Sequence, residues 1–208
     1  MSKNKETQLS WNDITLDQLL RIREIMNIED ETDRIMALGE VVYGDDVTGL
    51  SIPEFTKKMG QLGFLKEKVP TTVPPKKMTI NGRKYFTDCL LGNITTAQYI
   101  DFTNHMKAGK TIEPLSVFVI PEGHKYNDGY DMQEVINDVK SIPVPVAESI
   151  AFFFESQLRL FIKIFLHSSI RKIKKQKGLT KEEKQQAIDL IQQSASSVSS
   201  LMSLFSAK

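Results

Sequence analysis

The sequence predicts a mainly helical α+β protein: an N-terminal helical unit, a small region with one β-hairpin and a long C-terminal antiparallel helical hairpin. Three observations support this fold class. In the first and last thirds of the chain, apolar residues recur at steps of three and four, the spacing of one helix face. Between them, an Asn81-Gly82 pair separates two short stretches in the pattern of a β-hairpin. Proline-rich segments at 69–75 and 142–145 interrupt the chain.

Composition excludes several classes of protein. The chain has 208 residues, of which 40% are hydrophobic and 25% charged, and its net charge of +1 gives no general attraction to nucleic acid or anionic lipid. The single cysteine, Cys89, cannot form an intramolecular disulfide and fits a reducing compartment. Because the N-terminus is polar and no uncharged apolar stretch reaches about 18 residues, we expect a cytosolic protein without a membrane span.

The N-terminal unit should contain three helices. Thr15 can cap the first, and the second runs from about Glu31 to Val42 behind an acidic start that suits the helix dipole. Ser51 followed by Pro53 announces the third, because a proline is tolerated in the first turn. The predicted segments are a flexible arm at 1–10, a three-helix unit at 11–68, a proline-rich spacer at 69–75, an α+β region at 76–142 and a helical hairpin at 143–208.

The middle region should begin with a hairpin at 78–86, since Asn-Gly supplies both positive φ values of a type I′ turn. Thr95 or Thr96 then caps a helix that Gly109 closes. The stretch 115–120 fits a buried strand or part of a short helix equally well, because periodicity cannot separate them over six residues. Asp131 should cap a further helix through Val139.

The last third carries two long apolar patterns. Gly178 should end the first helix, and Thr180 with Glu183 forms a capping box for the second, so the two helices should fold back antiparallel. In the first helix a heptad seam is widened by a second stripe. The seam comprises Ala151, Phe154, Leu158, Phe161 and Phe165, and the stripe Phe153, Leu160 and Ile164. The second helix repeats the spacing with Ile188, Ile191, Ala195, Val198, Met202 and Phe205.

The second helix is rich in serine, a mediocre helix former, and should therefore depend on a packing surface for its stability. That surface is either the preceding helix or, if the second helix is a detachable or oligomerising arm, another molecule. The first helix carries more apolar positions than one seam can cover, which motivates the second interpretation.

No pattern in the chain predicts catalysis, a cofactor or a metal site. Phosphate loops, paired cysteines and nucleophile elbows are lacking, and the histidines His105, His124 and His167 are far apart in sequence. The oxygen ligands near 122–131 do not have calcium-loop spacing and are better explained as a turn and a helix cap. Cys89 is interpreted as a small buried residue. We therefore expect a protein that is not an enzyme.

Candidate contact residues lie in two places. A tyrosine-containing connector, with Tyr126 and Tyr130 predicted to be exposed, follows the apolar run that ends at Pro121. Aromatic side chains carry much of the energy of protein interfaces, so we expect both to bind a partner. In the helical hairpin the predicted partner-binding residues are Phe161, Phe165, Ile191, Val198, Met202 and Phe205.

Charge is unevenly distributed along the chain. Residues 1–65 contain seven basic and twelve acidic side chains, whereas residues 163–184 contain eight basic and two acidic ones. This asymmetry could steer a partner or pair the two ends of the chain. Possible phosphate contacts are Arg171, Lys172, Lys174 and Lys175. No aromatic residue lies among them to stack on bases, so a solvated helix end is favoured over nucleic-acid binding.

Three blocks, at 11–18 with the two acidic helices after it, at 94–102 and at 118–131, together resemble small proteins encoded among the structural genes of tailed bacteriophages, particularly those of gut Bacteroides-type hosts. Some of these proteins look like tail assembly chaperones. The resemblance covers roughly residues 11–165. It implies a non-enzymatic role in building the virion, in the host cytoplasm or in the particle itself. The implied partners are tail or connector proteins, with a homo-oligomer also possible, and the family has no active-site residues.

Overall fold

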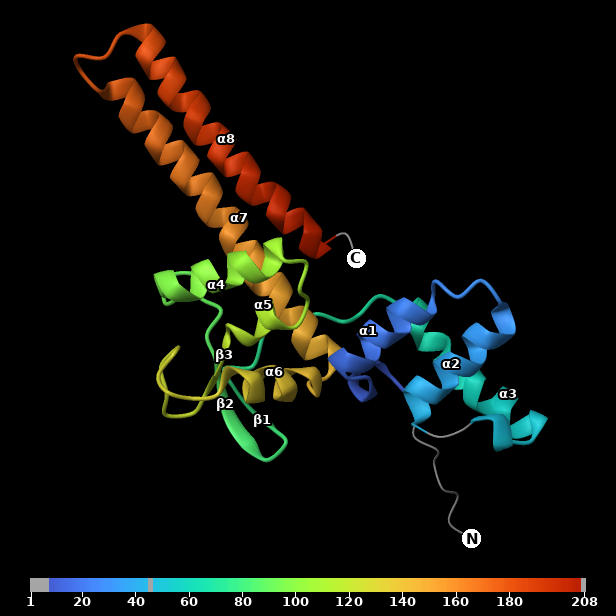
Figure 1. Cartoon of the computed structure of the whole chain (residues 1–208). Coiled ribbons are helices and arrows are strands. Elements are labelled where there is room, and N and C mark those ends of the chain that lie inside the picture. Colours follow the sequence, from blue (N-terminus) through green and yellow to red (C-terminus); the bar gives the residue numbers. More distant parts are fainter. Residues whose placement is uncertain (1–7, 45–46, 207–208) are drawn as a thin grey trace.

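The computed structural model describes residues 8–44 and 47–206, and for residues 194–195 and from 197 on it describes the backbone alone. Figure 1 shows a helical body from which two long helices project side by side. The predicted fold class is confirmed: the chain is mainly helical with a small antiparallel sheet.

Three helices form the N-terminal part: α1 (Leu16–Ile25), α2 (Glu31–Tyr43) and α3 (Ile52–Gly60). Each begins at a polar cap, since Thr15, Asp30 and Ser51 precede them and the first and last form capping boxes. Gly39 allows α2 to approach its neighbours closely, because a Cβ there would lie 2.9 Å from the Met59 side chain. The three predicted helices are therefore present.

Two backbone hydrogen bonds tie this part to the rest of the chain. The Leu16 amide donates to the Ile142 carbonyl at 2.9 Å, and the Val144 amide donates to the Ile14 carbonyl at 2.9 Å. They form an isolated antiparallel bridge between Thr15 and Pro143, directly before α1 and before the long helix α7 (Val144–Lys175). Buried residues between Trp11 and Leu158 in the sequence form one hydrophobic cluster. The domain boundaries that the sequence predicts stay predictions.

The middle region contains the predicted hairpin, formed by β1 (Lys77–Ile80) and β2 (Arg83–Thr87). Asn81 and Gly82 have φ values of 48° and 79°, as a type I′ turn requires. A third strand, β3 (Val119–Pro121), pairs with the other edge of β2. The sheet is thus larger than the single hairpin that the sequence predicts.

The segment 115–120 contains both of the structures left open by the sequence. It begins in the short helix α5 (Glu113–Ser116) and ends in β3. Its residues are buried, and Phe118 and Val119 are almost inaccessible to solvent. Two capped helices flank it: α4 (Thr96–Lys107), capped by Thr95, and α6 (Met132–Lys140), capped by Asp131.

Three phenylalanine rings form the centre of the core. Phe118 lies 4.4 Å from Phe154 of α7 and 5.5 Å from Phe102 of α4, measured between ring centroids. Phe102 and Phe154 are 4.7 Å apart at a steep angle. Such tilted aromatic pairs stabilise a fold beyond the burial of their surface. This triangle joins α4 and the α5–β3 segment to the long helix.

The helices α7 (Val144–Lys175) and α8 (Lys181–Ser206) form the predicted antiparallel hairpin. Gly178 has a φ of 92° in the turn, and the amides of Thr180 and Glu183 donate reciprocally to each other's side chains. Pro145 lies in the first turn of α7, where a proline is tolerated. The helix therefore starts inside the segment 142–145, which the sequence presents only as a break.

A polar network fastens the β-hairpin to α6. The buried carboxylate of Asp138 accepts hydrogen bonds from the Tyr85 hydroxyl and, at 2.9 Å, from the Asn81 side chain. Arg83 lies 3.5 Å from the same carboxylate and 3.0 Å from Glu134. Burial and then the hydrogen bond to Asp138 raise the pKa of Tyr85 to about 12, so its phenol remains a donor at neutral pH.

Asp138→Ala should lower the free energy of unfolding by about 2–3 kcal/mol, because the buried Tyr85 hydroxyl loses its acceptor. Urea denaturation followed by circular dichroism measures the loss. The control is Glu134→Ala, since Glu134 contacts the same Arg83 but its side chain is 57% exposed. We expect that change to cost less than about 0.5 kcal/mol. Equal losses in the two variants would show that the buried network is not what holds the hairpin.

Candidate interaction surface

Four apolar side chains on the projecting half of α7 are open to solvent. Leu160, Phe161, Ile164 and Phe165, here called the α7 strip, are 52%, 51%, 59% and 49% exposed. They follow one another at helical spacing and so share one side of α7. Nearer the body, Phe154 and Leu158 of the same helix are buried. The heptad seam is therefore covered only in its first part.

The helix α8 packs on α7 and buries its own Ile188, but leaves the α7 strip about half exposed. Of the strip residues, Phe161 and Phe165 were predicted to bind a partner. Leu160 and Ile164 were identified only as a second apolar stripe. The signal that could have singled them out is the width of the apolar face, which exceeds what one neighbouring helix can cover.

An apolar cavity of about 390 Å³ adjoins the strip. It lies between α7, α8 and the start of α4, and its lining includes Phe161, Phe165, Ile191 and Tyr99. The rings of Phe161 and Phe165 stack at 6.1 Å with an interplanar angle of 19°. The structure thus brings together three of the predicted contact residues, Phe161, Phe165 and the half-buried Ile191. The side chains of Val198, Met202 and Phe205 lie outside those that the structure describes.

Tyr126 and Tyr130 are less exposed than the sequence predicts, while their binding to a partner stays a prediction. Both are half-buried and pack against the main core. The Tyr126 hydroxyl donates a 2.7 Å hydrogen bond to the carboxylate of Asp101 on α4. Burial, and next this hydrogen bond, raise the pKa of Tyr126 well above its usual value. The two tyrosines anchor their loop, and the sequence-based prediction of their exposure was wrong.

The basic residues lie at the far end of the helical hairpin. Arg171, Lys172, Lys174 and Lys175 are all exposed in the last turns of α7. The Lys174 carbonyl accepts a 3.4 Å hydrogen bond from the Lys184 side chain across the turn. Figure 1 places this tip and the acidic start of α2 at opposite ends of the molecule, so the two regions cannot pair within one chain.

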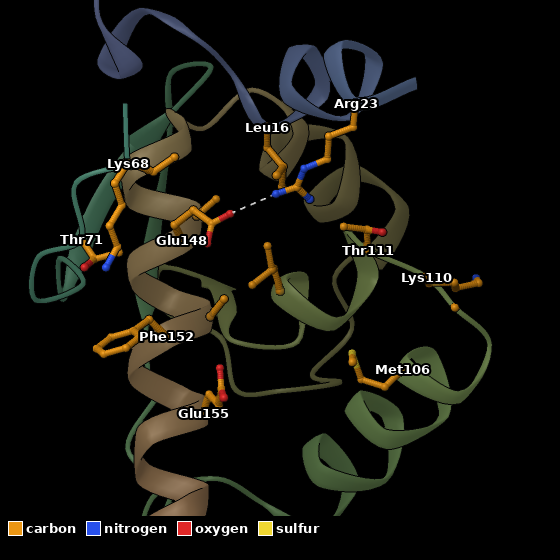
Figure 2. A pocket seen from close by; sticks show the side chains of 15 residues that line it. Leu16, Arg23, Lys68, Thr71, Met106, Lys110, Thr111, Glu148, Phe152 and Glu155 are labelled. Atoms are coloured by element: carbon orange, nitrogen blue, oxygen red, sulfur yellow. Dashed lines mark ion pairs between the residues drawn. The ribbon is translucent and has the colours of Figure 1, made fainter. Parts of the chain in front are cut away.

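A second cavity, of about 530 Å³, lies at the base of α7 (Figure 2). Leu16, Met106 and Phe152 contribute apolar walls, and the side chain of Arg23 reaches across to Glu148 at 3.5 Å. The other carboxylate in the lining, Glu155, is paired with Arg159. Its fifteen described lining residues include neither histidine nor cysteine. Both carboxylates of the described lining therefore have cationic partners.

The other reactive groups in the described part of the chain are not gathered into a site. Cys89 is buried, as predicted, and burial followed by the nearby Asp88 charge raises the pKa of its thiol to about 12. Within residues 8–44 and 47–206, no three His, Cys, Asp or Glu side chains are grouped as metal ligands. In the same ranges, every helix is too short or too polar to cross a lipid bilayer.

Comparisons of this chain with protein-family models, with curated proteins and with solved structures found no match.

The anchoring role of Tyr126 can be tested by removing its hydroxyl alone. Tyr126→Phe should lower the free energy of unfolding by about 1–2 kcal/mol, because the Asp101 carboxylate loses a hydrogen-bond donor. Thermal and urea denaturation measure the change. Lys125→Ala, at the exposed neighbouring position, serves as the control and should stay within about 0.5 kcal/mol of the wild type. An unchanged stability of Tyr126→Phe would remove the reason for treating this loop as anchored.

Proposed function

We propose that this chain is a tail or virion assembly factor of a tailed bacteriophage, which acts by protein–protein contact without catalysis in the host cytoplasm. The observation that carries the contact role is the α7 strip, four large apolar side chains each about half exposed on a projecting helix. Apolar surface of this kind, beside a hollow, is characteristic of sites where another protein binds. The phage context comes from the resemblance of blocks 11–18, 94–102 and 118–131.

A transient chaperone and a structural component of the virion would use the same contact surface. They differ in whether the protein remains in the finished particle. Mass spectrometry of purified particles beside infected-cell lysate separates the two roles. Stoichiometric presence in particles identifies a tail or connector component, whereas presence in lysate alone identifies an assembly chaperone.

The second candidate function is nucleic-acid binding by the exposed tip residues Arg171, Lys172, Lys174 and Lys175. Phosphate contacts release counterions, so this function requires an affinity that falls steeply with salt concentration. Neutralising Lys172, Lys174 and Lys175 together should then abolish binding to DNA or RNA. Salt-independent or undetectable binding by the wild type excludes this candidate.

The contact role predicts the effect of polar substitutions in the strip. Leu160→Gln with Ile164→Gln should reduce binding to the partner at least about tenfold, because two interface side chains lose their apolar contacts. The melting temperature should change little, since both side chains are half exposed and glutamine is a good helix former. Co-purification of tagged protein from infected cells, followed by titration with the identified partner, measures the loss.

The matched control is Ile52→Gln with Val73→Gln, which removes two apolar side chains that are 82% and 79% exposed outside the helical hairpin. This control should bind the partner as the wild type does. If the strip variant and the control bind equally well, the strip is not the contact surface.

A further inference from the structure

The apolar strip and three of the four basic tip residues, Arg171, Lys172 and Lys175, lie on one side of α7. Steps of four, seven and four residues lead from Leu160 to Ile164, Arg171 and Lys175. Phe161, Phe165 and Lys172 are separated by four and seven. Residues at these spacings share one face of a helix. Ser168, also exposed, occupies the position where the face changes from apolar to basic.

The strip has the apolar content of a standard protein interface. A large apolar side chain that is half exposed offers about 100 Å², so the four residues together offer roughly 400 Å². A standard interface buries about 800 Å² on each partner, of which about 57% is apolar, or roughly 450 Å². The strip therefore supplies most of the apolar surface that one partner would need to cover.

A second copy of this chain does not fit the face well. Two α7 helices packed in parallel would bring the exposed Arg171, Lys172 and Lys175 of both copies together, and like charges across an interface are unfavourable. In an antiparallel pair centred on the strip, Lys175 of one copy would lie opposite Ile150 of the other. Ile150 is completely buried in the body, so the projecting tip would meet the partner's body there.

We propose that the α7 strip binds an acidic amphipathic helix of another protein. The apolar stripe of that helix covers the strip, and acidic residues at one end meet Arg171, Lys172 and Lys175. This inference rests on the proposed contact function and names the chemistry of its partner. The rise from Leu160 to Lys175 is about 22 Å, so a helix of about 15 residues spans the whole face.

The apolar cavity beside the strip gives such a helix an anchor. Phe161 and Phe165 belong both to the strip and to the cavity lining, and their stacked rings form a preformed wall. A volume of about 390 Å³ has room for a large aliphatic or aromatic side chain of the incoming helix. Amphipathic helices bind grooves through anchors spaced by three and four residues.

Two designed peptides of about 18 residues test the inference. Both carry the same leucine stripe and a fluorescein label. One has three glutamates at the end that would meet the tip, and its twin has three lysines there. Fluorescence polarisation at low salt should show that the full-length protein binds the acidic peptide at least about tenfold more tightly than the basic twin. Raising the salt concentration should reduce this difference.

Protein variants separate charge recognition from apolar contact. Arg171→Glu with Lys172→Glu and Lys175→Glu should invert the preference between the two peptides. For each peptide, the affinity for the wild type is compared with the affinity for the variant. A difference in intrinsic helicity between the two peptides then does not affect the comparison. The variant with Leu160→Gln and Ile164→Gln should bind neither peptide. The Ile52→Gln and Val73→Gln control should bind both peptides as the wild type does.

Three outcomes would overturn the inference. The first is equal affinity of the wild type for the two peptides. The second is a dimer in analytical ultracentrifugation that the strip substitutions dissociate, because a second copy would then cover the strip. The third is a labelled oligonucleotide that displaces the acidic peptide from the tip. If the peptides bind equally while the strip variant still loses its natural partner, the proposed function stands and only the partner chemistry is wrong. If the strip variant still binds the peptides and its natural partner, both the proposed function and the proposed partner chemistry fail.

Discussion

The contact between Phe154 and Phe118 determines where the long helix α7 can lie, and much of the structure follows from that position. Phe154 occupies a triangle of rings contributed by α4, by the segment before β3 and by α7 itself. The start of α7 is fixed independently by the backbone bridge between Thr15 and Pro143. Because α7 is held at these two points and continues past them to Lys175, its remaining turns project beyond the body (Figure 1).

This arrangement divides α7 into a structural half and an exposed half with the same apolar character. Up to Leu158, α5 and the N-terminal part pack on α7, and Phe102 of α4 contacts Phe154. Beyond Leu158 the described neighbours of α7 are α8 and, beside Phe161 and Phe165, the start of α4, and together they leave the strip about half exposed. The apolar surface left over is adjacent to a hollow and continuous with a basic end, so both its shape and its charge restrict what can bind there.

Local signals in the sequence were sufficient for most of the elements. Asn81-Gly82, the capping residues Thr15, Thr95 and Asp131, and the Thr180–Glu183 box each act within a few residues, and each does in the structure what its pattern predicts. Burial was harder to predict because it depends on distant segments. Tyr126 lies in a polar loop, but its partner Asp101 is 25 residues away on another helix. Periodicity likewise identified the apolar positions of α7, yet which of them α8 covers is decided by packing between the helices.

The helix α7 contains neither glycine nor proline after its first turn, so it has no built-in hinge between the body and the tip. From Phe154 to Lys175 it extends about 32 Å as one stiff rod. Such a rod acts as a lever arm with its fulcrum at the ring cluster. A tilt of about 10° at Phe154 would carry the tip through about 5–6 Å, given that length. Force applied by a bound partner near Lys175 would accordingly reach the centre of the protein as torque on three phenylalanine rings.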